Sequence, residues 1–229
     1  MSEEIASYLG PKGYSIKKEY LSIQEQELIR KELTVKAFVP KNSIQQPTPF
    51  PVYRESPKKL YVPRFYGFKN YGDPDLIKIS DGEDIDVPFE GELREFQKPV
   101  VKAYIDSAIK YGAGLIEVHC GFGKTICALN IISKLKKKTL VIVHKEFLLE
   151  QWKERISQFL PTAKVGRIQA DIIDVEDKDI VIGMLQSLSM KSYPTSLFQR
   201  FGLTIVDETH HISSQVFSNA LFQIVTKYM

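Results

Sequence analysis

The sequence L-I-E-V-H-C-G-F-G-K-T-I-C-A-L, at residues 115–129, decides how the rest of the chain is interpreted. Residues 115–118 form a short apolar run that is typical of a buried β-strand. Two glycines follow, and a helical pattern begins with Lys124 and Thr125. A strand, a glycine-rich loop and a helix in this order, with a lysine and a hydroxyl at the turn, predict a phosphate-binding loop.

Each residue type in this loop suits phosphate binding. Glycines let backbone N–H groups approach phosphate oxygens, and the positive end of the helix dipole attracts the anion. We expect Lys124 to reach the β- and γ-phosphates of ATP and Thr125 to hold Mg²⁺. The full motif has glycine where this chain has Val118, and shorter matches also occur in loops without nucleotide. The predicted nucleotide-binding residues here are Gly121, Phe122, Gly123, Lys124, Thr125 and Ile126.

Composition sets wide bounds on function. The 229 residues suit one large domain or two smaller ones, and a net charge of +3 is too small to indicate nucleic-acid binding by itself. No apolar stretch is long enough to span a bilayer, and the acidic start lacks the apolar core of a signal peptide. Cys120 and Cys127 give neither a disulfide framework nor metal-ligand spacing. We therefore expect an intracellular, cytoplasmic protein without a membrane partner.

The charge distribution predicts a domain boundary. Residues 71–90 carry seven acidic side chains and one basic side chain, between two mildly basic regions. We predict a small mixed α+β domain over residues 1–88, ending in a solvated acidic linker at 71–88, and a second domain over 89–229. Within the first domain, Ser22 and Glu25 predict a capping box at the start of a helix over residues 22–33.

Residues 59–68, K-L-Y-V-P-R-F-Y-G-F, place four aromatic side chains among basic ones. Such a pattern could stack bases and neutralise phosphates. The alternative is that Tyr61, Phe65 and Phe68 build a small core, and we favour the core because aromatic side chains are more often buried than used as ligand platforms.

Helices and strands alternate in the second half of the chain. Apolar spacing predicts helices over residues 93–111, 145–160 and 213–225, and short β-branched runs predict strands at 139–143, 165–168, 179–182 and 203–206. This alternation predicts an α/β fold with a mainly parallel sheet flanked by helices. We attribute the basic run K-L-K-K-K at residues 134–138 to the dipole at a helix C-terminus.

Asp207 and Glu208 directly follow the last predicted strand. An aspartate at a strand end beside a phosphate-binding loop can hold Mg²⁺ through its waters, and a neighbouring glutamate can deprotonate the attacking water. We therefore predict Lys124, Asp207 and Glu208 as catalytic residues, with Thr125 and Asp207 at the metal. The alternative is that the two acids only cap the next helix.

These motifs resemble those of the DExH-type superfamily 2 helicases and translocases. C-G-F-G-K-T at residues 120–125 and D-E-T-H at 207–210 are similar to motifs I and II, with the XPB-like branch as the best match. L-V-I-V-H-K-E-F-L-L-E-Q-W resembles motif Ia, although His144 and Lys145 stand where a Pro-Thr-like pair is common. K-D-I-V-I-G-M-L-Q-S-L resembles helicases of large cytoplasmic DNA viruses. The resemblance covers residues 89–229 and is weak over 1–88.

The resemblance implies a RecA-like lobe that uses ATP and Mg²⁺ and binds nucleic acid, DNA in preference to RNA, in the host cytoplasm or virion. From L-R-E-F-Q at residues 93–97 it implies that Gln97 reads the adenine, with Arg94 nearby and Phe89 stacking. The residues implied at the nucleic acid and in coupling it to the ATP site are Gln186 and Ser187, with Lys145 from motif Ia, and His210 for coupling.

Family enzymes close ATP between two RecA-like lobes, and the second lobe supplies arginine fingers. The resemblance places a motif III strand between the strand before the glycine loop and the strand before Asp207, starting where this chain reaches Met229. We therefore expect an incomplete sheet and a fragment that binds ATP with little hydrolysis. An RNA helicase, a non-catalytic adaptor and a small P-loop kinase are the competing interpretations, and the kinase is disfavoured by D-E-T-H.

Overall fold

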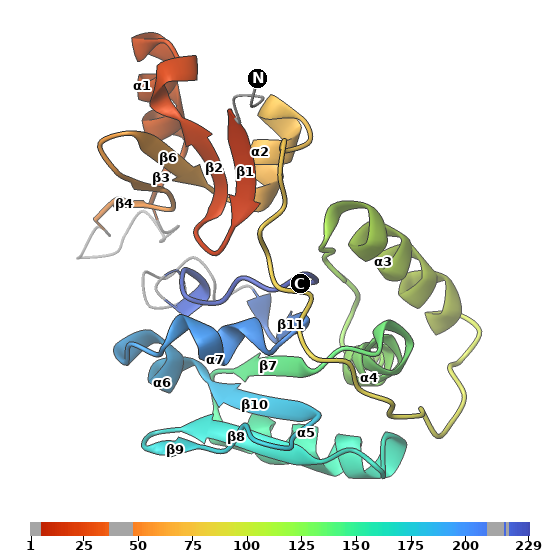
Figure 1. Cartoon of the computed structure of the whole chain (residues 1–229). Helices are drawn as coiled ribbons and strands as arrows, with labels where there is room; N and C mark the ends of the chain where they lie inside the picture. Colours follow the sequence, from red (N-terminus) through yellow and green to blue (C-terminus); the bar gives the residue numbers. More distant parts are fainter. Residues whose placement is uncertain (1–5, 37–47, 210–217, 219) are drawn as a thin grey trace, which may run out of the picture. The chain divides into compact units, whose positions relative to one another are not determined.

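The computed structural model describes residues 6–36, 48–209, 218 and 220–229. The chain divides into two compact units (Figure 1). Unit 1 comprises Met1–Ile79 and His210–Val225, and unit 2 comprises Ser80–Thr209 and Thr226–Met229. Each unit has its own sheet and its own apolar core. Within the described chain, no helix is both long and apolar enough to cross a bilayer.

Unit 1 is built on a four-stranded antiparallel sheet in the order β1-β2-β6-β5. The strands are β1 (Ser7–Gly10), β2 (Gly13–Lys17), β5 (Arg54–Glu55) and β6 (Lys59–Val62). Gly13 allows the tight turn between β1 and β2, because its φ of 95° lies in the region that favours glycine. A separate two-stranded pair joins β3 (Thr34–Val35) to β4 (Phe50–Pro51).

Two helices cover one face of this sheet. A 3-10 turn, η1 (Lys18–Tyr20), leads to α1 (Ile23–Glu32), whose N-cap Ser22 forms the predicted capping box with Glu25. The second helix is α2 (Arg64–Tyr71). It lies so close to the sheet that a Cβ at Gly67 would be 2.1 Å from Cγ of Tyr14. The buried core of unit 1 consists of Leu9, Tyr14, Ile16, Leu21, Ile29, Leu33, Leu60 and Val62.

The expectation that Tyr61, Phe65 and Phe68 form this core is confirmed only for Phe68, which packs against it. Phe65 is 48% exposed. Tyr61 points to the opposite face of the sheet, because strand side chains alternate and its neighbours Leu60 and Val62 are both in the core. The alternation within β6 therefore overrides the aromatic composition of the segment.

Unit 2 contains a five-stranded sheet in the order β11-β7-β10-β8-β9. The strands are β7 (Thr139–Val143), β8 (Val165–Gln169), β9 (Ile172–Ile173), β10 (Ile180–Met184) and β11 (Leu203–Val206). All neighbours except β8 and β9 pair in parallel. The four strands predicted from β-branched runs are confirmed, and β7 and β10 are buried along their whole length.

Helices cover both faces of this sheet, as the alternation predicts (Figure 1). One face packs against α3 (Gln97–Tyr111), α4 (Lys124–Leu135) and α5 (Glu146–Phe159) through Val141, Val143, Ile180 and Ile182. On the other face, Leu188 of α6 (Leu185–Met190) lies against Gly183 and Leu140. A last short helix, α7 (Thr195–Gln199), precedes β11. Of the helix predicted over residues 213–225, positions 213–217 and 219 lie outside the described residues; the described part is helical at residues 218, 220 and 221 only, so the prediction extends too far towards residue 225.

The strand predicted at residues 115–118 is not formed in the described chain, and Leu115 is 72% exposed. The backbone groups of a strand need hydrogen-bond partners on a neighbouring segment. In the described chain such partners are given for Gly112 and Gly114, just before the predicted strand. Met229 donates its N–H to the carbonyl of Gly112 and accepts from the N–H of Gly114, at 3.0 and 2.9 Å. The prediction of a buried strand at residues 115–118 is therefore wrong, because the hydrogen bonds to the neighbouring segment end at Gly114.

The same C-terminal residues pair with β11 on their other side. Tyr228 donates to the carbonyl of Gly202 and accepts from the N–H of Thr204, both at 2.9 Å, as a parallel bridge. Residues 228–229 consequently lie between the segment that leads into the glycine loop and the strand that leads into Asp207. This is the position that the resemblance assigned to the motif III strand.

The acidic linker predicted at residues 71–88 is not solvated throughout. Residues 81–87, which we call the acidic strap, run antiparallel to residues 136–138, and Ile85 and Val87 are buried in the core of unit 2. The strap and the basic run pair their charges: Asp86 with Lys136, Asp84 with Lys137 and Glu83 with Lys138. Lys134 in the last turn of α4 and the C-cap Lys136 fit the predicted helix-dipole explanation, whereas Lys137 and Lys138 lie beyond the helix and are explained by their pairing with the strap.

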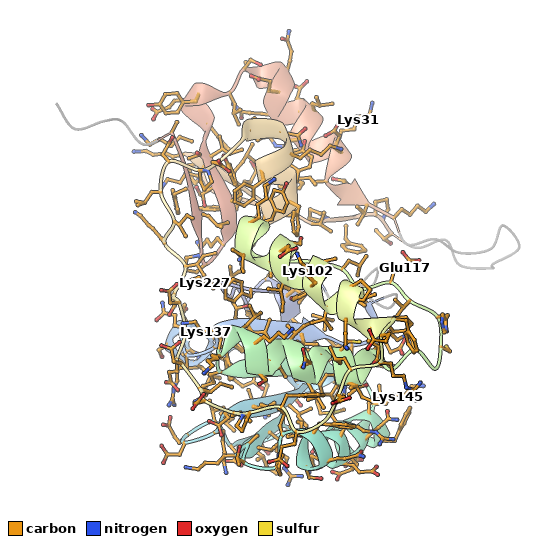
Figure 2. All side chains as sticks on the ribbon, turned by 90° about the vertical axis from the view of Figure 1, so that its right-hand side faces the viewer. Lys31, Lys102, Glu117, Lys137, Lys145 and Lys227 are labelled. Atoms are coloured by element: carbon orange, nitrogen blue, oxygen red, sulfur yellow. The ribbon has the colours of Figure 1, made fainter. Side chains whose placement is uncertain are left out.

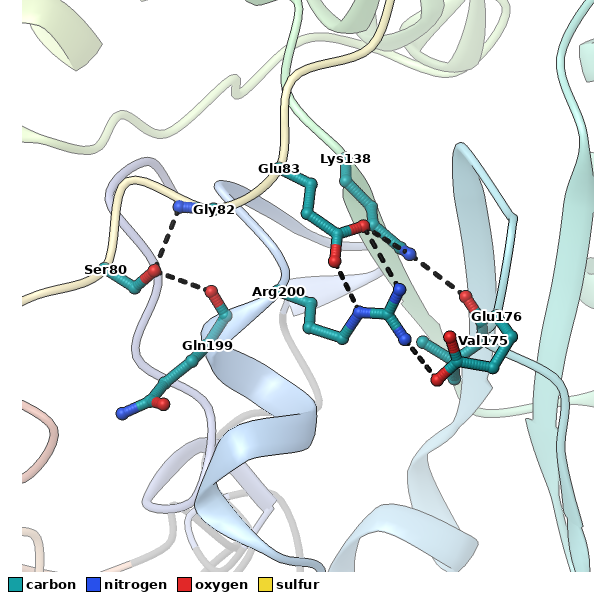
Figure 3. A network of polar contacts seen from close by, with 8 residues as sticks. All are labelled: Ser80, Gly82, Glu83, Lys138, Val175, Glu176, Gln199 and Arg200. Carbon is teal, nitrogen blue, oxygen red and sulfur yellow. Dashed lines mark hydrogen bonds and ion pairs between the residues drawn. The ribbon is translucent and has the colours of Figure 1, made fainter.

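Glu83 is the centre of this network (Figure 3). Its carboxylate accepts from Lys138 Nζ at 2.8 Å and from Nε of Arg200 at 2.5 Å, and Arg200 also pairs with Glu176. The Lys138 side chain is only 1% exposed, and its other described contacts are the carbonyl of Val175 at 3.0 Å and the ring of Phe201, whose centroid lies 6.0 Å from Nζ. The buried ammonium of Lys138 is thus neutralised by the Glu83 carboxylate of the acidic strap.

Candidate nucleotide-binding site

The glycine loop has the backbone conformation that its sequence predicts. Gly121 and Gly123 have φ values of 80° and 90°, which glycine adopts without strain. A Cβ at Gly121 would meet nothing within 4 Å, so the loop is open on this side. Phe122 anchors the loop, because its buried ring makes edge contacts with Phe96 and His119, with centroids 4.9 and 5.5 Å apart.

Helix α4 begins directly after the loop, at Lys124, with Gly123 as its N-cap. No side chain caps this end, so its N–H groups and positive dipole end remain directed at the loop. Among the described residues, neither Lys124 Nζ nor the Thr125 hydroxyl has a hydrogen-bond or ion-pair partner. Both side chains, and that of Ile126, are half-buried at this helix start.

Gln97 has a structural role that the sequence did not reveal. Its side chain is 2% exposed, donates from Nε2 to the Phe122 carbonyl at 2.8 Å, and accepts at Oε1 from the N–H of Arg94 at 2.9 Å. A Cβ at Gly123 would approach Gln97 Nε2 to 2.6 Å. Gln97 therefore fixes the loop to the start of α3, and this backing explains why glycine is required at position 123.

The other residues implied in adenine binding also contact protein groups. The Arg94 guanidinium is exposed and lies 5.9 Å from the ring centroid of Phe96. Phe89 stacks on Phe159, with centroids 5.6 Å apart and planes 8° apart. One face of the Phe89 ring is consequently covered by α5. The structure brings Arg94 and Gln97 together at the glycine loop through their hydrogen bond.

The acidic pair lies at the carboxyl end of β11. The N–H of Asp207 donates to the carbonyl of Ile142 at 3.1 Å, which continues the pairing with β7. Its Oδ1 accepts from the N–H of Glu208 at 3.0 Å, and its Oδ2 accepts from Nε1 of Trp152 at 2.9 Å. Glu208 has a φ of 56°, an uncommon conformation for a residue with a Cβ. Strain of this kind is concentrated at functional sites.

Trp152 is a site residue that sequence reasoning missed. The apolar spacing of its helix placed it with Leu148 and Ile156 on the buried side, and its ring is indeed 2% exposed. Its indole N–H still needs a hydrogen-bond partner when buried, and Asp207 provides it. The available signal was a tryptophan on the helix that follows β7, since β7 is the sheet neighbour of the strand that leads into the acidic pair.

The elements before the loop and before Asp207 run in the same direction at one sheet edge. Residues 228–229 bridge them through the hydrogen bonds with Gly112, Gly114, Gly202 and Thr204. The chain therefore leaves residues 112–114 and β11 in the same direction, towards the glycine loop and towards the acidic pair respectively. The backbone N–H groups of the glycine loop, a lysine, a hydroxyl and two carboxylates therefore follow parallel segments of unit 2.

This donor set fits a nucleotide with a divalent cation. The open glycine loop and uncapped α4 suit phosphate oxygens, while Thr125 and Asp207 are oxygen ligands of the kind that Mg²⁺ prefers. Asp207 is oriented by two donors before any metal binds. Preorganisation of this kind is typical of metal-holding carboxylates.

The residues implied at the nucleic acid lie at the same edge of the sheet. Gln186 donates from Nε2 to the carbonyl of His144 at 3.0 Å, and Ser187 Oγ accepts from the N–H of Ala170 at 2.8 Å. Lys145 precedes α5 and extends from the surface of unit 2 (Figure 2). These residues follow β10 and β7, whose ends Met184 and Val143 are paired. His210, implied in coupling, lies outside the described residues.

Comparisons with known proteins converge on one kind of protein. Residues 90–229 match the family described as "Type III restriction enzyme, res subunit". The whole chain is 34% identical to a protein of Acanthamoeba polyphaga mimivirus named as an ATP-dependent RNA helicase, of which it covers 45%. Over 56% of the chain, identity is 36% with 27% of the DNA 3'-5' translocase XPB2 of Sulfurisphaera tokodaii. The chain thus spans less than half the length of these relatives.

The fold also matches a solved structure. The SWI2/SNF2 ATPase core of Sulfolobus solfataricus in complex with dsDNA superimposes with a TM-score of 0.53, over 64% of this chain and 32% of that one, at 22% identity. At this identity the likeness establishes the fold alone, which is the RecA-like α/β fold predicted from the alternating elements.

Proposed function

Because this chain belongs to the superfamily 2 helicases, in the family of the type III restriction enzyme res subunit, we propose that unit 2 is the ATP-binding lobe of a nucleic-acid helicase or translocase. The observation that carries this proposal is an open glycine loop at an uncapped helix and an acidic pair after β11, on two segments that both pair in parallel with residues 228–229. The relatives named as helicases and as a translocase support it.

The residues take separate roles in this proposal. The loop N–H groups and Lys124 hold the β- and γ-phosphates, and Thr125 and Asp207 hold Mg²⁺, which would neutralise charge on the phosphates when bound. Glu208 orients and deprotonates the attacking water. Gln97 and Arg94 take the adenine side, which requires the Gln97 amide to exchange its bond with Phe122 for the base.

We further propose that hydrolysis involves a second RecA-like lobe, whose arginines would stabilise the charge that develops on the transferred phosphoryl group. The polynucleotide partner is assigned to Gln186, Ser187 and Lys145 at the same edge, with His210 coupling it to the ATP site. DNA is the favoured substrate because XPB2 is named as a DNA translocase. RNA is the second candidate, since the mimivirus relative is named as an RNA helicase.

The test is a titration of the 229-residue protein with a fluorescent ATP analogue in the presence of Mg²⁺. We expect saturable binding that is lost in Lys124→Ala. The matched control is Lys102→Ala, because Lys102 is exposed on α3 and pairs only with Asp106 in the described chain (Figure 2). Equal binding by the Lys124→Ala and Lys102→Ala proteins would refute the assignment of the loop, and so would an absence of binding in the unmodified protein.

A further inference from the structure

The sheet of unit 1 has two chemically different faces. In the register of β1, β2 and β6, Leu9, Tyr14 and Val62 form one row and belong to the buried core. The next row contains Tyr8, Ser15 and Tyr61, which therefore lie on the opposite face. We call this opposite face the tyrosine face; α1 and α2 cover the core side, and Phe222 contacts the tyrosine face only at its β5 end in the described chain, where Arg54 donates to the Phe222 carbonyl at 3.0 Å.

Lysine side chains gather around the two tyrosines of this face. Lys59 places Nζ 3.4 Å from the Tyr8 hydroxyl and 4.8 Å from its ring centroid, and Lys78 lies 5.1 Å from the same ring. Lys12 lies 5.1 Å from the ring of Tyr61. Tyr8 and Tyr61 are on strands separated only by β2, so the two groups are roughly 10 Å apart.

These lysines are not neutralised by carboxylates. In the part of the chain that the structure describes, no aspartate or glutamate lies within ion-pair distance of Lys12, Lys59 or Lys78. Two acidic groups of unit 1 have other partners: Glu19 pairs with Lys17, and Asp75 accepts from the N–H groups of residues 6 and 7.

The ionisation of Tyr8 agrees with a positive local potential. Burial raises the pKa of Tyr8, but hydrogen bonds from Ser15 and Lys59 and the charges of Lys59 and Lys78 outweigh burial and lower it. Three cations held on aromatic rings, with no carboxylate partner among the described residues, form a surface that attracts phosphate. When these lysines turn to backbone phosphates, the tyrosine rings that they cover become available to bases. A single nucleic-acid strand carries both groups at short intervals.

We propose that the tyrosine face binds a single nucleic-acid strand, with backbone phosphates on Lys12, Lys59 and Lys78 and bases against Tyr8 and Tyr61. This proposal rests on the nucleic-acid partner of the proposed function and gives unit 1 a part in holding the strand. It also returns Tyr61 to the role that the interleaved composition of residues 59–68 first suggested.

The experiment measures fluorescence anisotropy of a fluorescein-labelled oligothymidylate with the full 229-residue protein. The test variant is Lys59→Gln/Lys78→Gln, which keeps chain length and polarity but removes two charges from the face. Each phosphate contact on a single strand contributes about 0.7 to the salt slope, so the slope should fall by about 1.4 and binding at 0.1 M salt should weaken roughly 25-fold. Lys78→Gln alone, at an exposed position, should give about half of the change in slope.

The matched control is Lys31→Gln/Lys69→Gln, which changes net charge equally at exposed positions on α1 and α2 (Lys31 is labelled in Figure 2). Equal weakening in the test and control variants would overturn the proposal, as would undetectable binding by the unmodified protein. Duplex bound more tightly than the single strand with the same lysine dependence, or loss only of binding to anionic lipid vesicles, would also overturn it.

Failure of this proposal is distinguishable from failure of the nucleotide site. Lys124→Ala should leave oligonucleotide binding in the absence of ATP unchanged, while Lys59→Gln/Lys78→Gln should leave binding of the fluorescent ATP analogue unchanged. Replacing Tyr61 by leucine tests the stacking component separately, and loss of one base–aromatic contact should weaken binding at least about fivefold with an unchanged salt slope.

Discussion

Replacing Glu83 by glutamine should destabilise unit 2 far more than the exposure of Glu83 suggests. The substitution leaves the Lys138 ammonium, 1% exposed, with a neutral amide, the Val175 carbonyl and the Phe201 ring as its described partners, and none of them carries a negative charge. Removing one member of a fully buried ion pair costs about 3–5 kcal/mol. Because the Glu83 side chain is 45% exposed, water can replace part of the lost interaction, and we expect a loss of about 2 kcal/mol.

The assay is urea unfolding followed by the fluorescence of Trp152, the only tryptophan in the chain, which reports on unit 2 alone. The matched control is Asp86→Asn, because the Asp86–Lys136 pair of the same strap is exposed on both sides, at 87% and 63%. Pairs of this kind contribute about 0.5 kcal/mol or less. The double variant Glu83→Gln/Lys138→Met should recover at least about 1 kcal/mol relative to Glu83→Gln, because the unpaired buried charge is gone.

The stabilisation of unit 2 by Glu83 should depend on pH, and the pKa of Glu83 determines the direction. The pKa of Glu83 is lowered, because burial, which raises it, is outweighed by hydrogen bonds from Arg200 and Lys138. The stabilisation is therefore present above the ordinary value of 4.5 and is lost as the pH falls through the lowered folded pKa.

The reasoning would be refuted if Glu83→Gln and Asp86→Asn lowered the free energy of unfolding at pH 7 by amounts that agree within about 0.5 kcal/mol.

Three further predictions concern other contacts. Trp152→Phe keeps the ring but removes the donor to Asp207, so the Mg²⁺ concentration for half-maximal nucleotide binding should rise roughly tenfold; an unchanged Mg²⁺ titration would contradict this role. Gly123→Ala places a Cβ 2.6 Å from Gln97 and should lower the Tm more than Gly121→Ala, whose added methyl meets open space at a similar φ; thermal melts of both proteins decide. In unit 1, hydrogen bonds from Arg30 and Lys18 lower the pKa of Glu55 to about 2. Its stabilisation is present above 4.5 and disappears towards pH 2, so an acid titration by circular dichroism should show Glu55→Gln destabilised near neutrality but equal to the unmodified protein below about pH 2.

The sequence predicted best where local signals and burial agree. Strands β7 and β11 occupy the predicted residues because short β-branched runs have little alternative to a buried parallel sheet. The capping box at Ser22 and Glu25 is confirmed for a similar reason, since its two hydrogen bonds connect residues three apart.

Contacts between distant residues were not predictable from local patterns. The strap was read as a solvated linker because nothing in its acidic composition indicates that its partners lie 50 or more residues further along the chain. At the site, the loop glycines were visible in the sequence, but the roles of Gln97 and Trp152 depend on which polar atoms burial brings together. The prediction of a strand at residues 115–118 was wrong because an apolar run favours extended chain but does not specify which segment it pairs with.

The strap also constrains how this sequence can change over generations. If Lys138 is replaced first, Glu83 keeps Arg200 and contact with solvent, so an intermediate protein remains folded. If Glu83 is replaced first, a buried ammonium is left unneutralised and selection acts against the intermediate. Related chains that lack this pair should therefore include some that retain the acid without the lysine, and few that retain the lysine without the acid.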